Sequence, residues 1–139
     1  ISGATGTGKT CLASSIARAA VENGMTVKFV SAYEFNSAMI TAHTSPISQR
    51  NYLLSDYLDA DFLIIDDLGT EPMTRNVTTE YLLLIINERT INHKATIITS
   101  NISTDYISER YGERIYSRLS DKANSLVFSI KGKDLRRGR

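Results

Sequence analysis

The residues best suited to chemistry stand at the start of the chain, in the stretch GATGTGKT over residues 3–10. They fit the P-loop pattern G-x-x-x-x-G-K-[ST] in full. Glycines let the backbone fold tightly around an anion, and a helix that begins at Lys9 adds its positive dipole end. We expect Lys9 to reach the β- and γ-phosphates of a nucleotide and Thr10 to ligate Mg²⁺. The predicted phosphate-binding residues are Gly3, Thr5, Gly6, Thr7, Gly8, Lys9, Thr10 and Cys11. The alternative, a glycine-rich turn with a solvated lysine, is disfavoured because a helical pattern follows at once.

A second group of candidates follows the apolar run at residues 62–65. The stretch FLIIDD is typical of a buried strand whose carboxyl end carries Asp66 and Asp67. Ligands bind beyond the carboxyl ends of the strands in open α/β sheets. We expect Asp66 to hold Mg²⁺, directly or through water, and Asp67 to polarise the attacking water as a general base. The alternative is an acidic strand end that only caps the next loop.

A third group is the stretch IITSN over residues 97–101, where a buried strand ends in polar residues. This strand would bring an amide beside the same site, so Asn101 is a candidate for orienting the lytic water. By itself, the asparagine is better explained as a turn residue. The order along the chain favours the catalytic interpretation, since P-loop, acidic strand and polar strand follow one another as in ATPases that insert a strand between the first two.

A fourth group lies in the stretch GERIYSRL, residues 112–119. Arg114 and Arg118 are four residues apart and share one face of a predicted helix. An arginine here could complete the site of a neighbouring subunit and stabilise charge on the transferring phosphoryl group. Periodicity alone favours a simpler alternative, a surface ion pair with Glu109 or Glu113.

Two further features are weaker. Cys11 falls in the first turn of a predicted helix, where a thiolate is favoured, but a small buried filler is the simpler interpretation. The segment 44–57 mixes Arg50 with Tyr52 and Tyr57, a combination that can contact single-stranded nucleic acid. A plain amphipathic helix explains it as well.

The elements that must position these groups alternate between strands and helices, which indicates an α/β fold with a parallel sheet. Ser45 and Pro46 are expected to begin one helix, with serine as its cap and proline in its first turn. Leu12, Ile16, Ala17 and Ala20 are expected to form the buried face of the first helix. The predicted strands are residues 27–30, 62–66, 95–99 and 126–130, and the predicted helices are residues 9–23, 32–42, 45–58, 76–92, 104–111 and 113–120.

Composition bounds the function. The chain has 139 residues, 42 % of them apolar, which suits a single domain with a real core. The net charge of +1 gives no overall basic field, so any DNA contact would be a local patch. A single cysteine excludes an intrachain disulfide and fits a reducing, cytoplasmic setting. No apolar run approaches the ~20 residues of a membrane helix, so no membrane partner is expected.

Together the segments GATGTGKT, FLIIDDLGTEP, IITSN and YGERIYSRL resemble the AAA+ ATPases, most closely the DnaC/DnaI-type bacterial helicase loaders and the IstB-like transposition ATPases. The resemblance spans nearly the whole chain. It implies a three-layer P-loop sheet with strand order 5-1-4-3-2 and an absent or reduced helical lid. It also implies Mg-ATP as ligand, slow hydrolysis stimulated by DNA or a partner, and ATP-controlled delivery of a replicative helicase onto single-stranded DNA.

The resemblance also assigns roles to single residues. Asn101 matches the sensor-1 position, and Arg118 matches the arginine finger, which implies self-association through the Arg118 face. Most AAA+ proteins have glutamate where Asp67 stands, although the loader group often accepts aspartate. Arg136 is a candidate for a late basic contact. The segment 32–58 sits where initiator and loader ATPases carry an added helix near DNA.

Three rival functions remain at this point. An IstB-like transposition helper would use the same site with a different partner. A small-molecule P-loop kinase would need an acceptor-binding lid and usually another strand order, and the polar end of the IITSN strand and the Arg118 helix argue against it. A nucleotide-binding scaffold without hydrolysis is kept open by Asp67.

The position of the P-loop predicts how the domain is bounded. A P-loop follows a strand, and only Ile1 and Ser2 stand before Gly3. We therefore expect residues 1–139 to be an AAA+ core cut from a longer protein, without its amino-terminal partner-binding region and most of its first strand. That strand would lie between the 95–99 and 126–130 strands, so the shortened chain is expected to be poorly stable.

Overall fold

The computed structural model describes residues 1–132 and 134. It contains one five-stranded parallel sheet in the order β2-β3-β4-β1-β5, which confirms the predicted order. The strands are β1 (Ser2–Gly3), β2 (Val27–Ser31), β3 (Phe62–Leu68), β4 (Ala95–Ser100) and β5 (Ser129–Ile130). The helices are α1 (Lys9–Glu22), α2 (Ala32–Thr44), α3 (Ile47–Asp59), α4 (Thr78–Ile91), α5 (Thr104–Tyr111) and α6 (Glu113–Ser120).

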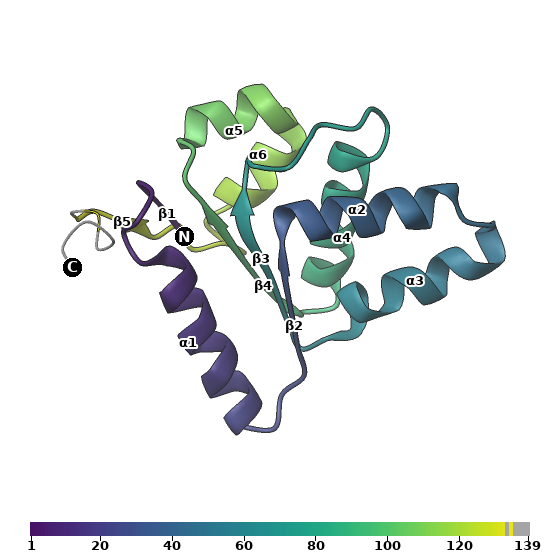
Figure 1. Ribbon diagram of the computed structural model, residues 1–139, viewed down its shortest axis with the longest axis horizontal. Helices are drawn as coiled ribbons and strands as arrows, with labels where there is room; N and C mark the ends of the chain where they lie inside the picture. The colour runs from purple at the N-terminus through teal and green to yellow at the C-terminus, as the bar shows by residue number, and fades with distance from the viewer. Residues whose placement is uncertain (133, 135–139) are drawn as a thin grey trace.

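The helices cover the two faces of the sheet unequally. Helix α1 lies on one side, and α2, α3 and α4 lie on the other (Figure 1). The large apolar core lies on the second side, where Leu63, Ile65 and Ile85 are fully buried. Parallel strands covered on both faces carry near-continuous apolar runs, which accounts for the composition of β3.

Helix α1 rests on the sheet through small side chains. Ala13 and Ala20 are buried, whereas Leu12 is 42 % exposed, so the predicted buried face of this helix was wrong at Leu12. Register pairs Phe29 with Ile64 and Ile64 with Ile97 in one row across the sheet. Side chains alternate between the faces of a strand, and Ile65 belongs to the core on the other face, so this row faces α1.

Several predicted boundaries were wrong, and two of them have a clear physical cause. Ser45 ends α2, because its backbone N–H and its hydroxyl both donate to the Thr41 carbonyl, and Pro46 is the extended residue before α3. The last strand contains only Ser129 and Ile130, because its partner β1 offers only Ser2 and Gly3 for pairing, and residues 126–128 before it are exposed.

The end of β3 carries an irregularity that bears directly on the site. Ile65 pairs with Ile98 and Leu68 pairs with Ser100, so Asp66 and Asp67 together oppose the single residue Thr99. This arrangement is a β-bulge, a feature over-represented next to active sites because it re-aims side chains.

Candidate nucleotide site

The P-loop connects β1 to α1 and has the backbone that its glycines permit. Gly6 and Gly8 have φ of 81° and 94°, values in the left-handed region that favours glycine. Gly8 caps α1 without any side chain, and the first turn of α1 holds no acidic residue. The helix therefore directs the N–H groups of its first turn and its positive dipole end toward the loop, which together form a ready site for an anion.

The lysine of the loop is folded inward. Lys9 is only 7 % exposed, and its Nζ donates to the carbonyls of Gly3 at 2.7 Å and Ala4 at 2.8 Å. Thr7 also binds Ala4, its hydroxyl donating to the same carbonyl at 2.8 Å. These bonds hold the ammonium inside the turn that would surround a phosphate group.

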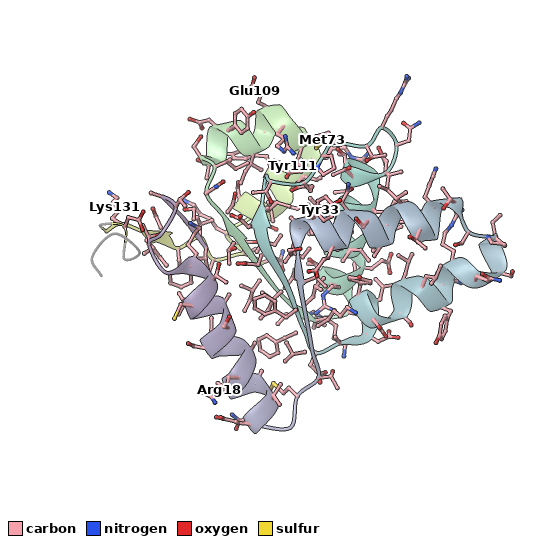
Figure 2. The ribbon with its side chains drawn as sticks, viewed as in Figure 1. Arg18, Tyr33, Met73, Glu109, Tyr111 and Lys131 are labelled. Atoms are coloured by element: carbon pink, nitrogen blue, oxygen red, sulfur yellow. The ribbon has the colours of Figure 1, made fainter. Side chains whose placement is uncertain are left out.

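The chain beyond β5 returns to this loop. A Cβ built on Gly6 would lie 2.0 Å from Oδ1 of Asp134, so a side chain at position 6 would collide with that carboxylate. Lys131 follows β5 at the end of the molecule where β1 and the start of α1 lie (Figure 2). Arg136, predicted as a late basic contact, lies outside the described residues.

The structure brings together the two predicted metal ligands. The Thr10 hydroxyl lies 3.1 Å from Oδ1 and 2.9 Å from Oδ2 of Asp66, although the two residues are 56 positions apart in sequence. Oxygen donors suit Mg²⁺, which uses one or two carboxylates together with substrate phosphates and water. Within the described residues no cluster of three His, Cys, Asp or Glu side chains could hold a metal alone. The pair therefore fits an ion shared with a bound phosphate.

Asp67 follows in a constrained backbone. Its φ is 62°, in the left-handed region. Its N–H donates to the Thr99 hydroxyl at 2.8 Å, and its carbonyl accepts from the Thr70 hydroxyl at 2.8 Å. Among residues 1–132 and 134, no hydrogen bond occupies the Asp67 carboxylate, so this group can accept a proton from a water molecule.

Thr99 is the residue that prediction from sequence missed. It is fully buried, and its hydroxyl donates to Oδ1 of Asp66 at 2.6 Å. Asn101, the predicted water-orienting residue, follows β4 as an exposed residue, and no hydrogen bond joins it to either acid in the described structure. Ser100 donates to the carbonyl of Leu68 at 2.7 Å and fixes the strand end. The polar residues at the end of IITSN indicated that this strand end lies near the site. Only the pairing of β4 with β3 shows that Thr99 is the one that contacts both acids.

A buried network holds the loop after β3. Glu71 is 3 % exposed, and its carboxylate accepts from the Gly69 N–H at 2.9 Å and from the Tyr111 hydroxyl. Arg110 donates to the Glu71 carbonyl. Burial is the main cause that raises the pKa of Tyr111 above its ordinary value, so its hydroxyl stays a proton donor. Met73 in this loop and Tyr111 on α5 lie at the same end of the molecule (Figure 2).

No hydrogen bond or ion pair joins the Arg118 side chain to these groups among the described residues. It is exposed on α6, on the wall of a shallow hollow that also includes Leu83 and Asn87 of α4. In the described part of the chain, neither Arg114 nor Arg118 forms an ion pair, and Glu113 instead accepts from Ser108. The predicted surface ion pair is therefore not observed there.

The two weaker candidates of the sequence, the 44–57 segment and Cys11, are only partly supported by the structure. Arg50 donates to the carbonyls of Ala42 and His43 and caps α2, and Tyr57 is buried in the core. Of the predicted single-strand contact, only Tyr52 remains well exposed, at 82 %. Cys11 is exposed, so its interpretation as a buried filler was wrong.

Comparison with known proteins identifies the family. A profile described as IstB-like ATP binding protein matches residues 1–137. The chain belongs to the IstB-like ATP-binding family. The AAA+ fold and the resemblance to DnaC-type proteins, both predicted from the motifs, are confirmed. No helix in the described part of this IstB-like chain is long and apolar enough to cross a membrane.

The IstB-like domain resembles replication proteins in sequence and structure. It is 27 % identical over 122 residues to the replicative helicase loader DnaC of Escherichia coli strain K12, covering 85 % of this chain and 48 % of DnaC. The crystal structure of the DnaC helicase loader superposes with a TM-score of 0.77 at 26 % identity, covering 94 % of this chain and 76 % of the other. The structure of AMPPCP-bound DnaA from Aquifex aeolicus superposes with a TM-score of 0.75 at 25 % sequence identity, covering 98 % of this chain and 41 % of the other. The chain thus spans about half the length of its curated relative.

Proposed function

We propose that this domain binds Mg-ATP, hydrolyses it to ADP and phosphate, and acts as the nucleotide-controlled switch of a helicase loader. The observation that carries the proposal is the contact between Thr10 and Asp66 at the start of α1, where no side chain caps the helix. A P-loop hydroxyl and a strand-end carboxylate meet there, where phosphate and a divalent cation would be bound together.

The residues divide the work of the reaction. The N–H groups of the P-loop bind the phosphates, and Lys9 exchanges the Gly3 and Ala4 carbonyls for phosphate oxygens. Thr10 and Asp66 would hold Mg²⁺, which neutralises charge on the transferring phosphoryl group. The Asp67 carboxylate takes the proton of the attacking water. Asn101 orients that water from the end of β4.

Nucleotide binding is tested with Lys9→Ala, because this change removes the cation that faces the phosphates. Binding is measured with a fluorescent ATP analogue, and alkylation of Cys11 gives a second readout, since it is the only cysteine and lies exposed beside Thr10. Mg-ATP should slow alkylation in the parent and not in the variant. Lys28→Ala is the matched control, because Lys28 lies on β2, where its ammonium pairs with Asp56 and lies over the ring of Tyr57. Equal ATP affinity in Lys9→Ala and the parent would refute the assignment.

The two acids are separated by a pair of substitutions. Asp66→Asn should weaken metal-dependent ATP binding, whereas Asp67→Asn should preserve binding and lower kcat, because it removes the base and little else. If both variants lost only binding, the division of roles would be wrong. A parent that binds Mg-ATP and shows no turnover, with or without single-stranded DNA, would favour the non-hydrolysing scaffold.

The partner is proposed from the relatives. The matched proteins named as replicative helicase loaders support a replicative helicase as partner and single-stranded DNA as the place of delivery. The IstB-like description favours a second candidate, a transposition helper whose partner is a transposase. Co-purification of the full-length protein with each partner, in ATP and in ADP, separates the two. Nucleotide-dependent capture of the transposase alone would overturn the loader proposal.

A further inference from the structure

The β-bulge at the end of β3 makes one side chain the common neighbour of both acids. Asp66 and Asp67 oppose Thr99, which is fully buried on β4. The Thr99 Oγ1 lies 2.6 Å from Oδ1 of Asp66 and 2.8 Å from the backbone nitrogen of Asp67. In a regular ladder, one residue of β4 would oppose one residue of β3, so this double contact depends on the bulge.

The chemistry of these groups fixes the direction of each hydrogen bond. A backbone N–H can only donate, so the Thr99 oxygen must accept from Asp67. The single hydroxyl proton of Thr99 is then directed to Oδ1 of Asp66. With Oδ1 held from β4, the closer Thr10 contact falls on Oδ2, at 2.9 Å. The carboxylate plane of Asp66 is thereby set between β4 and the P-loop.

The same hydroxyl restrains the backbone of Asp67. A left-handed residue other than glycine persists when surrounding contacts determine its conformation. Here the N–H is held by Thr99 and the carbonyl by Thr70. Without Thr99, the N–H of a half-buried residue would have no acceptor in the described structure, and the direction of the Asp67 side chain would no longer be fixed.

We propose that Thr99 is a positioning residue, whose hydroxyl aims Asp66 at the cation held with Thr10 and fixes the backbone that presents Asp67 to water. The inference rests on the proposed function, because positioning matters only if the two acids serve Mg-ATP. In this role Thr99 acts through the two acids, to which its hydroxyl is bound.

Three variants test this role. Thr99→Val keeps the shape of the side chain and removes both hydrogen bonds, and Thr99→Ser restores the hydroxyl. Thr96→Val is the matched control, because Thr96 lies on the same strand and its hydroxyl accepts from Arg89 on the opposite face of the sheet. Thermal unfolding of all three shows which variants are folded at the assay temperature.

The measurements separate positioning from simple loss of structure. Changing a residue that orients a metal ligand typically costs about 10–100-fold in metal affinity or activity. Thr99→Val should therefore raise the Mg²⁺ concentration for half-maximal ATP binding and lower kcat, each within that range. ATP-analogue binding in EDTA should change little, and the Asp67 amide should exchange its hydrogen faster. Thr99→Ser should match the parent, and Thr96→Val should match it in all but stability.

The outcomes are distinct. A folded Thr99→Val with the Mg²⁺ dependence, kcat and Asp67 amide exchange of the parent would overturn the role of Thr99 and leave the proposed function intact. Equal kinetic losses in Thr96→Val would show a general structural effect and also overturn it. If the parent binds Mg-ATP without turnover, hydrolysis fails, while the Mg²⁺ titration and amide exchange still decide on Thr99. A parent that binds no nucleotide would refute the proposed function itself.

Discussion

Arg89 is expected to be the side chain on α4 whose loss most weakens the fold. It is fully buried, and its guanidinium donates to the carbonyls of residues 57, 58, 60, 61 and 95 and to the hydroxyl of Thr96. Burial lowers the pKa of this guanidinium from its ordinary value, and the charge of Asp61 partly opposes that shift. The side chain thus joins the end of α3 to the starts of β3 and β4, away from the acids.

The magnitude of the loss follows from the carbonyls that Arg89→Met leaves without a donor. The contacts to Tyr57 at 2.8 Å and Ala95 at 2.6 Å are the shortest. An acceptor left unpaired costs about 1–3 kcal/mol where it is buried, as the Tyr57 carbonyl is, and less where the residue is exposed, as Ala95 is, so the two give roughly 2–5 kcal/mol. The change also removes the free-energy cost of keeping a cation buried, which offsets part of this loss. The expected decrease in the free energy of unfolding is therefore about 2–4 kcal/mol. This is a large fraction of an ordinary stability of about 5–15 kcal/mol.

Urea denaturation followed by circular dichroism measures this loss directly. Arg18→Met is the matched control, because the Arg18 side chain is 82 % exposed on the outer face of α1 (Figure 2) and should change stability by less than about 0.5 kcal/mol. Arg89→Lys should lie between parent and Arg89→Met, since an ammonium keeps the charge but has no planar fork of donors. A loss below about 1 kcal/mol in Arg89→Met, or parental stability in Arg89→Lys, would refute the reasoning.

Three further outcomes are expected. Hydrogen bonds from the Thr26 N–H, Lys94 and the Thr26 hydroxyl lower the pKa of Asp61 to about 2. The stability that this carboxylate contributes is therefore complete above about pH 4 and is lost as the pH falls toward 2. Asp61→Asn should make the loss of stability with falling pH shallower in that window. Tyr111→Phe leaves the buried Glu71 carboxylate one donor short and should cost about 1–3 kcal/mol in urea denaturation, and a change within error would contradict the network. Mixing full-length Arg118→Ala with Asp67→Asn should restore part of the ATPase activity at shared interfaces, and no recovery with assembly confirmed would argue for a structural arginine.

Local motifs made much of the fold predictable. The P-loop pattern, the acidic end of β3 and the polar end of β4 each lie within a few consecutive residues. Their order along the chain, together with the family resemblance, then gave the sheet order that is observed. What these motifs share is that each can be recognised from its own few residues, before its contacts with other elements are known.

Contacts that depend on register or on several elements at once were not predictable. Thr99 reaches both acids only because a bulge shifts β3 against β4. Arg89 lies on α4, and the leucines and isoleucines of this helix explain why the helix is buried. The sequence around Arg89 does not indicate which five carbonyls it binds. Ser45 was expected to cap the helix that follows, but its hydroxyl binds Thr41 in the helix before. In each case the arrangement depends on a contact with another element or with the preceding helix, and the local sequence does not specify that contact.

The backbone at Asp67 offers a physical account of its departure from the usual glutamate. Aspartate and asparagine enter the left-handed region more readily than longer side chains, because their short polar groups can bond locally. With φ at 62° and both peptide groups held by Thr99 and Thr70, position 67 favours the shorter acid. The same preference makes Asp67→Asn a conservative change for the backbone, so a loss of turnover in that variant can be assigned to the missing carboxylate and not to a refolded loop.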